Sequence, residues 1–126
     1  MFKKLLSLLS LGLLMAGCRG TVTNLTPRQE FRNASGLYPV EAAFITSQQS
    51  ARWDSVKANV IAGQDFYPMR YTQHMTNRWE TLIPAPPGTK IIYYRFKFDY
   101  LYNVFGGAPK PNSLSSKIYT LKVVDQ

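Results

Sequence analysis

The chain offers few side chains for covalent or acid–base chemistry. Its 126 residues include one histidine, His74, and one cysteine, Cys18. A zinc site takes three or four histidine, cysteine or carboxylate ligands, so the usual cluster cannot be assembled. A Ser-His-Asp arrangement would have to use His74, which sits among polar residues that favour an exposed loop. The sequence therefore predicts no metal, no cofactor and no catalytic residue, and we expect a protein that is not an enzyme.

Carboxylates leave one catalytic alternative open, because a pair of them can cleave a glycosidic bond that they flank. Seven are present, and none lies in a recognisable motif: Glu30, Glu41, Asp54, Asp65, Glu80, Asp99 and Asp125. Catalysis by such a pair is therefore not what the sequence favours.

Ligand binding by aromatic side chains is more plausible than catalysis, since sugar rings can stack on flat apolar faces. The predicted ligand-binding residues are Trp53, Tyr71, Trp79, Tyr93 and Arg95. Trp53 falls in a polar stretch, residues 48–54, that we expect to be a loop. Trp79 shares a strand face with Thr81 and Ile83, and a buried tryptophan is typical of sandwich cores. For Trp79 the sequence therefore favours a place in the core over a place in the binding site.

The chain is basic, with a formal net charge of +8. Arg95 and Lys97 share the outward face of one expected strand, and such a surface would be attracted to an anionic bilayer or cell-wall polymer. The alternative is a basic surface that keeps the protein soluble, with edge lysines that discourage aggregation. Basic proteins often bind nucleic acid, but no such motif is present and the N-terminus indicates export. We expect no nucleic-acid partner.

One stretch organises the rest of the chain. Residues 90–102 are rich in β-branched and aromatic residues, which favour strands. Successive strand side chains point to opposite faces, so one face is almost wholly aromatic and carries Ile92, Tyr94, Phe96, Phe98, Tyr100 and Tyr102. The other face is largely charged. Such a strand belongs in an antiparallel sheet covered on one side, so a second layer must bury the aromatic face.

The same period of two recurs along the chain. Further strands are expected over residues 37–46, 56–62, 66–71, 78–84 and 117–124, and residues 103–116 are expected to form a long loop. The resulting six or seven short strands, separated by turns and without a helical period, indicate an all-β, antiparallel two-sheet sandwich.

The first 17 residues have the pattern of a secretory signal. Lys3 and Lys4 form a positive region, and residues 5–14 form an apolar run that is shorter than the roughly 20 residues of a membrane-spanning helix. An N-terminal core helix is the alternative, but the leucines show no amphipathic period. The polar residues after the signal predict a tether, which leaves room for a first short strand near Val22 to Leu25. The expected division is a signal peptide over 1–17, a tether over 18–34 and a folded domain over 35–126.

The signal ends in Leu14-Met15-Ala16-Gly17-Cys18. This segment resembles the lipobox of bacterial lipoproteins, with Met15 where that family usually has leucine or another aliphatic residue. The resemblance implies that the signal is removed before Cys18, which carries a diacylglyceryl thioether, and that the new N-terminus is acylated. More than one acyl chain is what stable anchoring requires. Arg19, in place of aspartate, would imply sorting to the outer membrane in enteric bacteria.

Residues 76–124 contain, in order, a tryptophan-bearing strand, a Pro/Gly turn, the aromatic stretch 93–99, a Pro111-Asn112 loop and a closing strand. This layout resembles immunoglobulin-like domains, most closely the glycogen- and starch-binding type attached to carbohydrate enzymes. The resemblance implies an immunoglobulin-like architecture and raises the prospect of sugar binding.

These observations predict a lipid-anchored protein of the bacterial cell envelope whose β-sandwich binds or scaffolds without catalysis. The expected partners are the lipid bilayer, through acylated Cys18, and a cell-wall or other polysaccharide or an envelope protein. The alternative is a polysaccharide-binding module that uses exposed aromatic residues.

Overall fold

A computed structural model of the protein describes residues 20–126, so the predicted signal peptide and Cys18 lie outside the described residues. Ten strands follow one another: β1 (Thr21–Asn24), β2 (Gln29–Phe31), β3 (Leu37–Ile45), β4 (Ala51–Ala62), β5 (Asp65–Pro68), β6 (Arg70–Tyr71), β7 (Arg78–Pro84), β8 (Ile91–Tyr102), β9 (Lys110–Ser115) and β10 (Tyr119–Val124). In this part of the chain no helix has the length and hydrophobicity needed to span a membrane.

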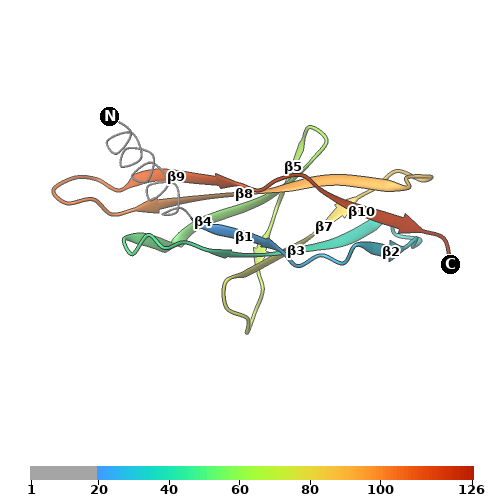
Figure 1. Ribbon diagram of the computed structural model, residues 1–126, viewed down its shortest axis with the longest axis horizontal. Coiled ribbons are helices and arrows are strands. Elements are labelled where there is room, and N and C mark those ends of the chain that lie inside the picture. Colours follow the sequence, from blue (N-terminus) through green and yellow to red (C-terminus); the bar gives the residue numbers. More distant parts are fainter. Residues whose placement is uncertain (1–19) are drawn as a thin grey trace, which may run out of the picture.

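The strands form two sheets packed face to face (Figure 1). The small sheet has the order β1-β3-β7-β6, and the large sheet has the order β2-β10-β8-β4-β5. Strand β9 extends the large sheet by pairing with the C-terminal half of β8, whose N-terminal half pairs with β10. Only β2 and β10 run parallel. The predicted all-β, immunoglobulin-like sandwich is confirmed.

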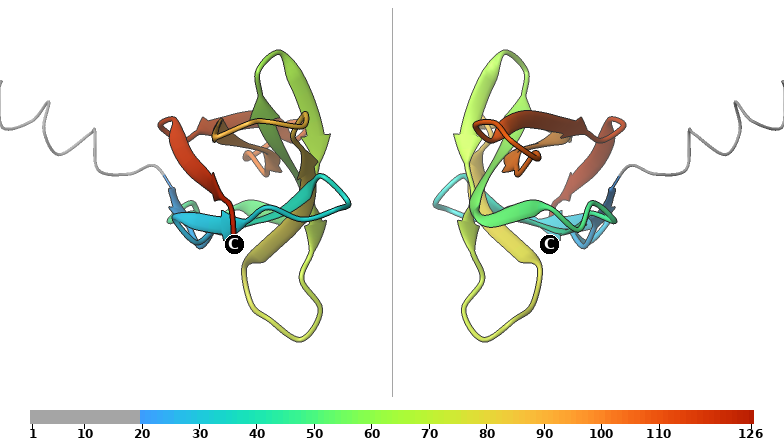
Figure 2. Two further views of the ribbon diagram at one scale, coloured as in Figure 1. Left: turned by 90° about the vertical axis from the view of Figure 1, so that its right-hand side faces the viewer. Right: turned by 90° about the vertical axis from the view of Figure 1, so that its left-hand side faces the viewer.

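Over residues 20–126 the chain passes from one sheet to the other five times, and two of these passages affect the predicted boundaries. β1 pairs with β3 in the small sheet, whereas β2 pairs with β10 in the large sheet. Residues 21–31 are therefore part of the sandwich, which begins at Thr21 and not at residue 35. The other passage that matters lies between β5 and β6 and divides the expected strand 66–71. Figure 2, looking along the sandwich, shows the chain there passing from one layer to the other.

Two expected loops contain strands. β4 begins at Ala51, so Trp53 lies in a strand, and residues 110–115 of the expected loop 103–116 form β9. β9 pairs with the end of β8 at the rim of the sheet and is mostly exposed, so it has no apolar alternation for the sequence to reveal. Pro111 and Asn112, taken as a loop in the resemblance to immunoglobulin-like domains, belong to this strand.

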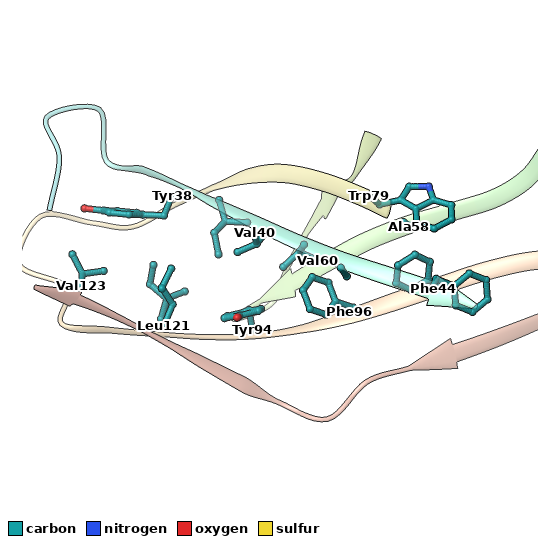
Figure 3. Packing of buried hydrophobic residues seen from close by; sticks show 14 of the residues in the cluster. Tyr38, Val40, Phe44, Ala58, Val60, Trp79, Tyr94, Phe96, Leu121 and Val123 are labelled. Atoms are coloured by element: carbon teal, nitrogen blue, oxygen red, sulfur yellow. The ribbon is translucent and has the colours of Figure 1, made fainter. Parts of the chain in front are cut away.

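The core lies between the sheets and is centred on β8. Its side chains Ile92, Tyr94, Phe96, Phe98 and Tyr100 are buried, as the alternation predicts. Phe98 stacks on Phe44 of β3 with ring centroids 4.6 Å apart. It also meets the edge of the Trp79 ring of β7 at 5.3 Å. Figure 3 shows the same packing between the layers, with Phe44 from one sheet and Tyr94 and Phe96 from the other lying in the space between them.

Candidate functional site

The five predicted ligand-binding residues fall in two separate places. Trp53 and Trp79 contact Phe44 at one edge of the sandwich, and Tyr71 contacts Trp79. Tyr93 and Arg95 lie on the outer face of the large sheet, where the alternation of β8 places them. The sequence therefore named residues of two surfaces, and no single site contains all five.

At the sandwich edge, Trp79 is a core residue and its two neighbours are half exposed. Trp79 is only 5% exposed and packs edge-on to Phe44, with ring centroids 6.1 Å apart. Trp53 is 46% exposed, 6.0 Å from Phe44. Tyr71 is 50% exposed, 5.1 Å from Trp79. The core alternative thus holds for Trp79, while Trp53 and Tyr71 each offer part of a ring to solvent.

The outer face of the large sheet carries an excess of positive charge. Register places Lys57 of β4 opposite Asp99 of β8, and Lys122 of β10 opposite Ile91. We call this surface the cationic face and define it by Lys57, Arg95, Lys97 and Lys122. Asp99 is the only carboxylate that points outward from β8, β10 and residues 57–62 of β4, and its Oδ2 lies 3.9 Å from Lys97 Nζ. Among the described residues, Lys57, Arg95 and Lys122 form no ion pair.

Apolar side chains lie between these charges. Tyr93, 60% exposed, and Ile91 alternate with Arg95 on β8. Phe66 of β5 is also exposed and pairs in register with Ile61, which is itself opposite Arg95. Flat apolar groups next to unpaired cations can contact a polymer in two ways at once, through its carbon skeleton and through its anionic groups.

A hollow of about 690 Å³ continues this face toward the β8–β9 hairpin. It lies where a bulge in β4, between Arg52 and Lys57, interrupts the pairing with β8. Ser55 bridges the gap, because its Oγ accepts a hydrogen bond from Leu101 N at 2.8 Å. The lining side chains are Ser55, Lys57, Asp99, Tyr100, Leu101, Pro111, Asn112 and Ser113. The hollow therefore offers hydroxyl, amide and charged groups beside the cationic face.

The small sheet differs in its charge balance. On its outer side, Arg70 Nε lies 3.4 Å from Glu80 Oε1, and Arg78 Nη1 lies 3.7 Å from Glu41 Oε1. These paired charges largely cancel. The positive excess is thus concentrated on one of the two broad surfaces.

His74 lies in the exposed loop between β6 and β7 and has a positive φ of 63°. Among residues 20–126, no three His, Cys, Asp or Glu side chains come close enough together to hold a metal ion.

Sequence reasoning identified Arg95 and Lys97 on one face but did not include Lys57 and Phe66 in the site. Alternation along a strand gives the face of each residue, and it carries no information on which strands become neighbours. Lys57 joins the site only because β4 pairs with β8, and Phe66 only because β5 pairs with β4.

Comparisons with known proteins do not assign the chain to a family. No family model, characterised protein or solved structure matches it. The chemistry of the two surfaces is therefore the basis for inferring a function.

Proposed function

We propose that this chain is a lipid-anchored, non-catalytic binding domain of the bacterial cell envelope, and that its cationic face binds an anionic envelope polymer. The charge asymmetry between the two sheets carries the proposal. Within the large sheet, β8, β10 and residues 57–62 of β4 expose four cations against one carboxylate, whereas Arg70 and Arg78 on the small sheet are each paired with a glutamate. An anionic polymer lying across strands β4, β8 and β10 would meet these cations without displacing an internal partner from three of them.

The anchor is supported by the lipobox-like segment and by the position of Cys18 next to the folded domain. Only Arg19 and Gly20 separate Cys18 from the first strand. Acyl chains on Cys18 would therefore hold the sandwich at the bilayer surface.

Acylation of Cys18 is the direct test of the anchor. When the full chain is produced in a Gram-negative bacterium, we expect it in the membrane fraction, with an N-terminal peptide that begins at Cys18 and carries acyl chains by mass spectrometry. Cys18→Ala should abolish this modification. A chain that keeps residues 1–17 and remains in the cytosol would contradict the anchor.

A second candidate function, polysaccharide binding at the sandwich edge, is favoured by the half-exposed rings of Trp53 and Tyr71. If sugar rings stack there, Trp53→Ala should weaken retention in gels containing soluble glucan, by about tenfold for a loss of about 1.4 kcal/mol. Tyr93→Ala is the matched control, because Tyr93 is also aromatic and exposed but lies on the other surface. Equal retention of both variants and the parent would exclude stacking on Trp53, provided that circular dichroism remains native.

A further inference from the structure

The β8–β9 hairpin extends past the end of the sandwich and has an apolar tip (Figure 1). Its last paired residues are Tyr102 and Lys110, and Asn103 N donates a hydrogen bond to Ser50 O at 2.9 Å. Beyond that point, residues 104–109 read Val-Phe-Gly-Gly-Ala-Pro, without one polar side chain. Phe105 is fully exposed, more than any other large apolar side chain among the described residues.

The turn conformation and hydrogen bonds at the base of the hairpin define the position of the tip. Gly106 has a φ of 72°, a conformation that glycine adopts without steric cost. At the base, the buried Tyr100 Oη accepts a hydrogen bond from Asn112 Nδ2 at 2.9 Å and donates one to Gln48 Oε1 at 3.1 Å. These contacts join β8 and β9 to the β3–β4 connection. The fold therefore supports a hairpin whose tip presents Phe105 away from the rest of the protein.

The tip lies at the end of the sandwich where the chain enters the fold. Gly20 lines a hollow of about 320 Å³ together with Tyr100 and Tyr102, and β1 starts beside the end of β3. Cys18 precedes Gly20 by two residues, which span at most about 7 Å. Phe105 follows Tyr102, the last residue of β8, by three residues, which span at most about 10 Å. Acyl chains on Cys18 and the ring of Phe105 can therefore reach one surface, whereas β2 and the C-terminus lie at the opposite end (Figure 1).

We propose that the tip of the β8–β9 hairpin inserts into the lipid bilayer as a second contact beside the lipid anchor. Its geometry rests on the proposed acylation of Cys18, which would bring a bilayer to this end of the sandwich. Lys110, next to the tip, has no ion-pair partner among the described residues and can reach anionic headgroups while its stem stays in apolar surroundings. Residues 103–110 contain no acidic side chain that a headgroup would repel.

Insertion would also orient the domain. With the tip and the N-terminal end at the bilayer, the strands run away from the membrane and the cationic face stands upright, open to polymers of the envelope. Phe105 would lie about 5–10 Å inside the headgroup–acyl boundary, the depth reached by apolar side chains of interfacial segments.

Quenching by brominated acyl chains tests this directly. The full chain, purified from membranes, is reconstituted into phosphatidylethanolamine–phosphatidylglycerol vesicles with or without bromine on the acyl chains. Phe105→Trp is made in a Trp53→Phe background, which leaves only the buried Trp79 as a constant emitter. Phe31→Trp is the matched control, an exposed aromatic position in β2 at the far end. We expect the emission of the added tryptophan at position 105 to fall about twofold or more in brominated vesicles, as for a residue within the acyl boundary, and that at position 31 to stay unchanged.

The outcomes separate the tip from the anchor, because intact mass reports acylation in the same samples. Equal quenching at positions 105 and 31 would overturn tip insertion and leave an acylated Cys18 in place. A blue shift at position 105 without quenching would mean that protein covers the tip, for example a second copy, and would also overturn it. If Cys18 is not acylated, the lipid anchor fails. Tip insertion then fails with it unless the added vesicles still quench position 105.

Discussion

Replacing Phe98 with alanine is expected to lower the free energy of unfolding by about 3–5 kcal/mol, the usual loss for a buried phenylalanine. Phe98, in the large sheet, has no solvent exposure and packs against the small sheet, stacking on Phe44 and meeting the edge of Trp79. Its removal leaves a cavity where the sheets meet. Since a domain of this kind is stable by about 5–15 kcal/mol, the variant should be largely unfolded well below the parent's denaturation midpoint.

Denaturant titration of the purified full chain measures this loss, and Tyr93→Ala is the matched control. Tyr93 belongs to the same strand but points outward, so its replacement should cost about 1 kcal/mol or less. A similar loss for both variants would mean that the aromatic side of β8 is not the core. That result would remove the basis for the sandwich.

Reversing the charge of Arg95 and Lys97 together is expected to abolish most polyanion binding. Each basic residue near an anionic surface contributes about 1 kcal/mol, and reversal replaces attraction with repulsion, so Kd should rise by about two orders of magnitude at low salt. Both side chains are at least partly exposed, and Asp99 competes only for Lys97. Arg95→Glu/Lys97→Glu should therefore leave the fold intact while it converts the centre of the cationic face to a negative surface.

Binding is measured by titration with heparin fragments as a defined polyanion, followed by cosedimentation with purified cell-wall sacculi. Arg70→Glu/Arg78→Glu changes the net charge by the same amount on the small sheet. If the face matters, this control should keep most of the affinity, and if only net charge matters, the two double variants will lose it equally. Raising the salt to about 1 M, where the Debye length is about 3 Å, should weaken binding by the parent as well.

The lipobox-like signal and the resemblance of residues 76–124 to glycogen- and starch-binding domains lead to different experiments. Acylation is decided by the mass of the N-terminal peptide, and sugar stacking by Trp53→Ala. Polyanion binding depends on neither result, because the cationic face lies wholly on described strands. If one of these three proposals fails its experiment, the other two are not affected.

The amino-acid sequence by itself determined the fold class and which side chains of β8 are buried. Side-chain direction alternates along any strand, so Phe96 and Phe98 had to share a face with Tyr94 whatever the partners were. It also determined that Arg95 and Lys97 point the other way. Each of these conclusions follows from the alternation of side chains along a single strand, which does not depend on the neighbouring strands.

The tertiary structure alone decided which of these residues form a site. Lys57 joins Arg95 and Lys97 through the register of β4 with β8, and Trp79 leaves the predicted binding set because Phe44 and Phe98 surround it. Strands β1, β2 and β9 lie at sheet edges, where backbone pairing suffices without an apolar pattern. The position of Gly20 beside the base of the β8–β9 hairpin depends likewise on contacts between segments about 80 residues apart. Such contacts are fixed by packing and not by local side-chain alternation.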